Sequence, residues 1–137
     1  MNKTRQLGFS LLEILFTIAI VGILLSIGYP SYTSHIVHVR RNEAILGLND
    51  LAGHIEQFYE INNSYQNATL RALNFKEYTE DGFYKFSIDT AISSEYEISA
   101  IPQQSQEKSD NECGILSLNQ NYEKKSSKSV RPEICWQ

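Results

Sequence analysis

The chain has 137 residues, of which 42% are hydrophobic, and 12 basic against 16 acidic residues give it a formal net charge of -4. This length excludes a protein of several large domains, because it leaves room for one small domain with one core beside an apolar N-terminal run. The charges are unevenly distributed, so the net charge alone indicates no class of partner.

The N-terminal apolar run, residues 9–29, is long enough to cross a lipid bilayer. It has 21 residues and a single charged side chain, Glu13, and a transmembrane helix needs about 20 apolar residues. The preceding "MNKTRQLG" contains Lys3 and Arg5, and basic residues beside a span favour its cytoplasmic side. The chain therefore divides into a polar segment at 1–8, a transmembrane helix at 9–30 and a domain outside the cytoplasm at 31–137.

A second helical pattern follows Pro30, a residue that we expect to kink or break the first helix. Apolar residues recur at helical spacing over 45–59, and charged residues occupy the other positions. This pattern predicts an amphipathic helix that covers a sheet and ends near "INNSY" at 61–65, where two Asn and a Ser offer turn chemistry. Residues 65–82 follow no regular pattern and are interpreted as a connecting loop with room for a short helix at 70–73.

Four short segments in the second half of the chain are typical of strands. Their side chains alternate between two faces, and turn-length gaps separate several of them. The segments are "YKFSID" (84–89), "YEISAI" (96–101), "GILSLN" (114–119) and "YEKKS" (122–126). We therefore expect an α+β fold in which a long N-terminal helix, half transmembrane and half amphipathic, packs on a small antiparallel sheet.

The two cysteines, Cys113 and Cys135, are most simply interpreted as one disulfide of an exported domain. Two free buried thiols are the alternative.

The start of the apolar run resembles the leader-peptide junction of type IV pilins and related pseudopilins. The resemblance rests on Gly8-Phe9, the following "SLLE" that ends at Glu13, the apolar helix and Pro30. It implies that residues 1–8 are a leader, that a prepilin peptidase cuts after Gly8 on the cytoplasmic side, and that Phe9 is then methylated. "CGILSLNQ" and the terminal "CW" resemble the end of PilE-like minor pilins, in which the two cysteines close the D-region.

Glu13 is expensive in an apolar helix, since a charge at the bilayer centre costs roughly 2.5 to 3.5 kcal/mol on insertion scales. If the helices of several subunits bundle, this charge needs a partner, and cutting after Gly8 creates one in the α-amine of Phe9 on a neighbouring subunit. The resemblance implies that this pair fixes the register of assembly, because a wrong stagger leaves the charge unpaired. The alternative is a Glu13 side chain that reaches the lipid headgroups.

A basic segment, residues 122–133, stands out in an otherwise acidic chain. Without Lys3 and Arg5 the chain has 10 basic and 16 acidic residues, a net charge of -6. Four cations lie in the segment: Lys124, Lys125, Lys128 and Arg131. Such a segment can bind DNA by neutralising phosphates, and it resembles in general terms the basic D-region of ComP-like DNA-receptor pilins. A solvated turn, or a contact with the acidic face of a neighbouring pilin, are the alternatives.

The other chemistry-bearing residues point to no enzyme. His35 and His38 have helical spacing but no evident third ligand, so a solvated helix surface is favoured over a metal site. Glu95 and Glu97 lie at alternate strand positions and are typical of a solvated face. Phosphate-binding loops, zincin motifs and nucleophile elbows are missing from the sequence. We therefore expect neither catalysis nor a cofactor nor a metal.

By this resemblance the chain is identified as a minor type IV pilin of a Gram-negative bacterium. Its expected role is structural: it joins or primes a pilus with other pilins and so supports adhesion, twitching motility or DNA uptake. The expected partners are major and minor pilins, the prepilin peptidase, the inner membrane before assembly and the inner-membrane assembly machinery. The alternatives are a pilus-borne DNA receptor that uses the basic segment and a type II secretion pseudopilin.

Overall fold

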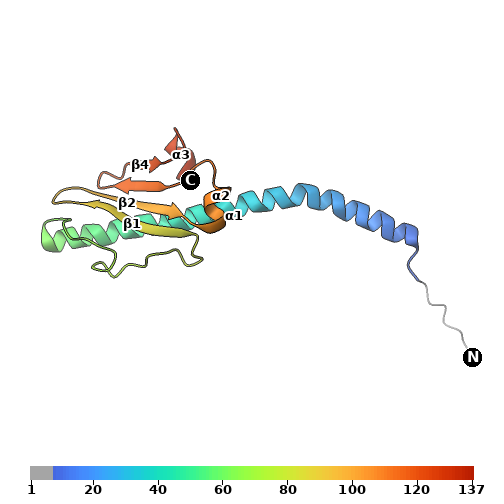
Figure 1. Ribbon diagram of the computed structural model, residues 1–137, viewed down its shortest axis with the longest axis horizontal. Coiled ribbons are helices and arrows are strands. Elements are labelled where there is room, and N and C mark those ends of the chain that lie inside the picture. Colours follow the sequence, from blue (N-terminus) through green and yellow to red (C-terminus); the bar gives the residue numbers. More distant parts are fainter. Residues whose placement is uncertain (1–7) are drawn as a thin grey trace, which may run out of the picture. The chain divides into compact units, whose positions relative to one another are not determined.

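The structure, a computed structural model, describes residues 8–137, so the predicted leader lies outside the described residues except for Gly8. The chain divides into two compact units, one that ends at Ile36 and one that spans Val37–Gln137. Within residues 8–137 the elements are, in chain order, α1 (Leu11–Asn62), β1 (Tyr84–Ala91), β2 (Tyr96–Pro102), α2 (Gln104–Ser109), β3 (Leu116–Asn119), β4 (Lys124–Ser126) and α3 (Pro132–Cys135) (Figure 1).

The first unit contains the N-terminal part of α1, whose apolar side chains are exposed from Leu11 to Tyr32. By length and composition, α1 is the helix in the described residues that can cross a membrane. Pro30 lies inside α1, so the helix does not break there. A kink at Pro30 stays a prediction.

In the second unit, the C-terminal part of α1 lies along one face of the sheet (Figure 1). Its apolar stripe is fully buried at Ala44, Leu48, Leu51, Ala52 and Ile55, so the predicted amphipathic helix is confirmed. The sheet contributes the opposite side of the same core, namely Tyr84, Phe86, Tyr96, Ile98, Ala100, Leu116 and Leu118. The helix approaches β1 closely at Gly47, where a Cβ would collide with the Phe86 ring.

The sheet of the described residues has the strand order β1-β2-β3-β4, and each neighbouring pair is antiparallel. This is the predicted antiparallel sheet; short turns join β1 to β2 and β3 to β4, whereas the connection from β2 to β3 contains α2. Alternation places the apolar side chains of β1, β2 and β3 against α1, while the register shifts by one residue between Ile88 and Thr90 of β1. The predicted α+β fold is confirmed.

Three local features differ from the prediction or were not predicted. Residues 70–73 form hydrogen-bonded turns instead of a helix, because Asn74 adopts a φ of 51° and ends the turn. The helix α2 has only six polar residues and no apolar period that could reveal it. The helix α3, which was not predicted, has four residues and begins at Pro132, a residue favoured at the first helical position.

Candidate functional site

The basic segment folds as strand β4, a loop and the short helix α3, and these elements send its cations to different sides. Lys124 pairs with Leu118 and Lys125 pairs with Ser117 across β3. Because opposite residues of an antiparallel pair point to the same face, Lys124 lies on the core side of the sheet edge and Lys125 on the other face. On that other face, Lys125 Nζ lies 3.2 Å from Glu97 Oε1.

The other three cations of the segment lack an acidic partner. Among the described residues 8–137, Lys124, Lys128 and Arg131 have no carboxylate oxygen within 4.0 Å, and all three side chains are exposed. Lys124 Nζ instead lies 5.6 Å from the centre of the Trp136 ring. Lys128 and Arg131 line a shallow depression together with Glu112, Val130 and Ile134. We group Lys124, Lys128 and Arg131 because they are exposed and lack an acidic partner among residues 8–137, and we call them the cation surface.

Three serines fix the backbone of the loop that carries these cations. Ser126 Oγ donates to the Cys113 carbonyl at 2.7 Å, and Ser127 Oγ accepts from the Ile115 N–H at 2.9 Å. Ser129 Oγ accepts from the Arg131 N–H at 3.2 Å and lies 3.0 Å from the carbonyl oxygen of the same residue. Serine hydroxyls that bond nearby backbone groups favour turns of this kind, so the loop has a defined conformation.

A disulfide between Cys113 and Cys135 closes the segment, as predicted, and both cysteines are buried. The terminal Trp136 is also buried and donates its indole N–H to the Lys125 carbonyl at 3.1 Å. Its ring therefore packs inside the domain and does not offer a stacking surface. Tyr122 remains as an exposed aromatic ring of the segment, with 54% of its surface accessible.

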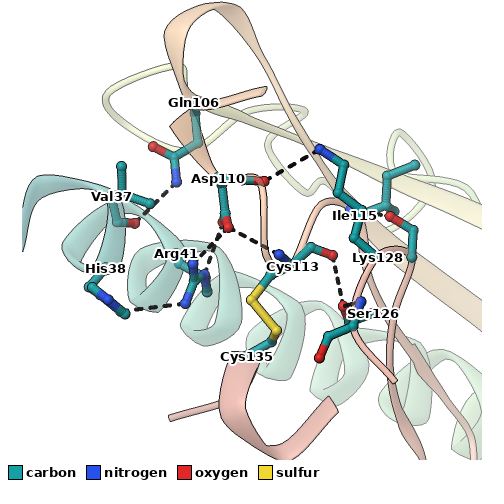
Figure 2. A network of polar contacts seen from close by, with 12 residues as sticks. Val37, His38, Arg41, Gln106, Asp110, Cys113, Ile115, Ser126, Lys128 and Cys135 are labelled. Atoms are coloured by element: carbon teal, nitrogen blue, oxygen red, sulfur yellow. Dashed lines mark hydrogen bonds and ion pairs between the residues drawn. A yellow bond between two sulfur atoms is a disulfide. The ribbon is translucent and has the colours of Figure 1, made fainter. Parts of the chain in front are cut away.

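Beneath the loop lies a buried ion pair between helix α1 and the segment after α2 (Figure 2). Arg41 donates to both carboxylate oxygens of Asp110, with distances of 2.9 Å from Nε and 2.7 Å from Nη2. Burial lowers the pKa of Arg41, but its bonds to Asp110 and the charge of that carboxylate outweigh burial and raise the pKa above its usual value. The sequence carries no local signal for this pair, because 69 residues separate its members.

Tyr84 and Gln106 extend this network. The Tyr84 hydroxyl donates to Asp110 Oδ2 at 3.0 Å, and Gln106 Nε2 donates to that hydroxyl at 3.2 Å and to the Val37 carbonyl at 3.1 Å. Burial is the largest cause that raises the pKa of Tyr84. The hydroxyl therefore stays protonated at neutral pH and can donate to Asp110.

The predicted assembly residues lie in the first unit. Gly8 and Phe9 precede α1, and Glu13 lies in its first turn. The Phe9 ring is 81% exposed, and Glu13 is exposed as well. Both side chains are therefore accessible to other molecules. The roles of Gly8 and Phe9 in cleavage and methylation, and of Glu13 in register, stay predictions.

The remaining candidates form no site in the described part of the chain. His35 and His38 are exposed, and His38 Nδ1 lies 3.4 Å from Arg41 Nη1. Glu95 is exposed, whereas Glu97 is half-buried and paired with Lys125. Searched over residues 8–137, the structure holds no group of three or more His, Cys, Asp or Glu side chains that could bind a metal ion.

Two family comparisons match nearly all of the chain up to β3. The family described as "Type IV minor pilin ComP, DNA uptake sequence receptor" matches residues 30–117, and the prokaryotic N-terminal methylation motif matches residues 3–29. The basic segment lies outside both matches. A comparison with curated proteins gave no match.

A comparison with solved structures found the non-core minor pilin PilV of Neisseria meningitidis. That structure shares 18% sequence identity with this chain, at a TM-score of 0.57, over 72% of this chain and 93% of the PilV chain. At this identity the similarity shows a shared fold and nothing about what the chain binds.

Proposed function

The chain belongs to the type IV minor pilin family, and on this premise we propose that it is a pilus subunit that binds duplex DNA at the cation surface. The family match covers the C-terminal part of α1 and the first two strands, and the methylation motif covers the predicted leader junction and the apolar helix. Pilins are structural proteins that assemble with other pilins into a pilus. This chain therefore has such pilins as its partners, and the match favours a pilus subunit over a type II secretion pseudopilin.

Processing and assembly follow from the leader junction in this proposal. A prepilin peptidase cuts after Gly8 and methylates Phe9, and the apolar part of α1 holds the subunit in the inner membrane of a Gram-negative cell. The assembly machinery then transfers the subunit to the pilus. There Glu13 pairs with the α-amine of Phe9 on a neighbouring subunit, because a buried charge without a partner is costly. The support for these steps is the methylation motif at residues 3–29 and the exposed apolar helix.

The observation that carries DNA binding is the cation surface itself. Lys124, Lys128 and Arg131 have no acidic partner among residues 8–137, and a disulfide and three serines order the loop between them. A loop whose backbone is already ordered loses little backbone freedom on binding phosphates, so more of the electrostatic attraction appears as affinity. The matched family is described as a DNA uptake sequence receptor, which favours DNA as the polyanion.

The charge of the rest of the domain limits the affinity. The mature chain has a net charge of -6, and Glu112 lines the same depression as Lys128 and Arg131. These charges repel a polyanion except near the cation surface. With three phosphate contacts, the slope of log affinity against log salt is expected to be about -2 to -3, and the dissociation constant is expected on the order of micromolar.

The test is a salt titration with the full chain in a nonionic detergent and labelled duplex DNA. The wild type should show micromolar, salt-sensitive binding, and the triple variant Lys124→Ala, Lys128→Ala, Arg131→Ala should lose it. Arg71→Ala is the matched control, since Arg71 is another exposed cation without a carboxylate partner in the described residues, in the loop before β1. If the wild type does not bind duplex near physiological salt, DNA is not its ligand and the structural role of a minor pilin that joins or primes the pilus remains.

A further inference from the structure

The carboxylate of Asp110 has its full complement of hydrogen bonds. Oδ1 accepts from Arg41 Nη2 at 2.7 Å and from the Cys113 N–H at 3.2 Å. Oδ2 accepts from Arg41 Nε at 2.9 Å and from the Tyr84 hydroxyl at 3.0 Å. A carboxylate offers about four lone pairs, and all of them are used here, so the position of Asp110 is fixed from α1, from β1 and from the disulfide.

From Asp110 two short connections lead to the loop of the cation surface (Figure 2). Cys113 donates its N–H to Asp110, and its carbonyl accepts from Ser126 Oγ at 2.7 Å and from the Lys128 N–H at 3.3 Å. The backbone carbonyl of Asp110 also lies 3.5 Å from Lys128 Nζ. The carboxylate of Asp110 is therefore connected to the loop through Cys113, and its backbone carbonyl contacts the side chain of Lys128 directly.

The ion pair between Arg41 and Asp110 contributes little net free energy to folding, but it fixes the position of the groups that bond to it. Both side chains are buried, with accessibilities of 4% for Arg41 and 0% for Asp110. Burying two charges costs nearly as much as their attraction returns, and apolar residues of similar size often stabilise a core equally well. Apolar replacements would leave the Cys113 N–H without its acceptor, however, and the loop would lose its connection to α1 and β1.

We propose that Asp110, held by Arg41 and Tyr84, is a positioning residue for DNA binding that fixes the loop of residues 126–131 and the direction of Lys128. This inference rests on the proposed function for its DNA readout, but not for its structural readout. Asp110 is itself buried and touches no DNA. Its carboxylate acts through the Cys113 N–H and through the two bonds that the Cys113 carbonyl accepts; these bonds hold the loop where Lys128 Nζ meets the Asp110 backbone carbonyl.

The first test measures amide hydrogen exchange in residues 126–131 of the full chain in detergent, without DNA. Replacing the pair by Arg41→Met with Asp110→Leu should leave β1 and β2 protected and speed exchange in the loop at least about fivefold, since the opening of a segment governs its exchange. If the loop exchanges as in the wild type while the variant is folded, Asp110 does not position it.

A second pair of variants decides the question if the double variant fails to fold. Tyr84→Phe removes one bond to Asp110, whereas Tyr96→Phe removes an equally buried hydroxyl that has no partner in the described residues. The Tyr84 variant should speed exchange in residues 126–131, and the Tyr96 variant should not. Equal exchange in the two variants would contradict the proposal.

DNA binding supplies a readout that a merely structural role would not change. In the double variant Arg41→Met, Asp110→Leu, the slope of log affinity against log salt should become shallower by about one, as if Lys128 no longer met a phosphate. Adding Lys128→Ala should then change affinity less than it does in the wild type, because the two changes act on one contact. A wild type that binds no DNA would refute the proposed function, and hydrogen exchange would still decide the positioning role.

Discussion

Lys125 Nζ lies 3.2 Å from Glu97 Oε1, on the face of the sheet opposite the one to which Lys124 belongs. The contact is diagonal across β3, since Glu97 pairs with Asn119 and Lys125 pairs with Ser117. From the sequence, Lys124, Lys125, Lys128 and Arg131 were candidates for one DNA or pilin contact, with a solvated turn as the alternative. Alternation along β4 places Lys125 on the opposite face from Lys124, and Glu97 pairs with it, so the proposed DNA contact is assigned to Lys124, Lys128 and Arg131.

This separation gives a matched pair of substitutions. Lys124→Ala should weaken duplex binding and make the salt slope shallower by about one, because one phosphate contact is lost. Lys125→Ala should leave the duplex affinity and the salt slope near the wild-type values. Because the pair between Lys125 and Glu97 is exposed, its loss should change the free energy of unfolding by less than about 1 kcal/mol. Titrations at two salt concentrations would check this. Equal losses in the two variants would mean that DNA contacts Lys125 as well as Lys124, and that the contact is not confined to the proposed cations.

The sequence predicted the helix, the strands and the disulfide because each has a local signal. Alternation marks the strands, the apolar stripe marks α1, and Asn63 at a φ of 52° follows the end of α1 where turn residues were expected. The ion pair between Arg41 and Asp110 has no local signal, because its members meet only when α2 folds back on α1. The partner of Lys125 likewise depends on strand register, which residue spacing alone does not determine.

The disulfide should contribute to stability through the loop it closes. Cys113 and Cys135 are 22 residues apart, and the chain-entropy model gives about 3 kcal/mol for a loop of this size. The double variant Cys113→Ala, Cys135→Ala should lower the free energy of unfolding by about that amount in denaturant titrations. In the wild type, mass spectrometry should find both thiols blocked to alkylation before reduction. Two thiols that react freely in the folded chain would exclude the bond.

Processing should begin the mature chain at Phe9. Gly8 has no side chain, so a peptidase can approach its backbone closely at the edge of the membrane. Gly8→Val should therefore keep the leader attached, which would appear as a heavier chain in mass spectrometry of membrane extracts. An unprocessed wild type in cells that express the peptidase would contradict the predicted cleavage site, whereas Gly22→Val is a control that should be cut normally.

Alkaline pH should destabilise the domain through three buried tyrosines. Burial, followed by hydrogen bonds to Glu56, raises the pKa of Tyr65 to about 12, and burial also raises the pKa of Tyr84 and of Tyr96. Because these groups ionise at lower pH in the unfolded chain, their contribution is complete below pH 10 and is lost as pH rises through the folded values. Three of the eight tyrosines should thus ionise at higher pH than the others in a titration followed by tyrosinate absorbance. Replacing the exposed Tyr78 by Phe should leave that late step unchanged.

Glu13→Leu should separate membrane insertion from assembly. The change removes a charge from an apolar helix, so insertion should be at least as efficient as in the wild type. Incorporation into pili should fail or fall strongly, because no carboxylate would remain to pair with the α-amine of Phe9 on a neighbouring subunit. Glu13→Asp keeps the charge on a shorter side chain and should retain more incorporation than Glu13→Leu. Counting copies in sheared pili against membrane levels measures both steps, and a Leu variant present in pili at the wild-type ratio would show that Glu13 does not set the register.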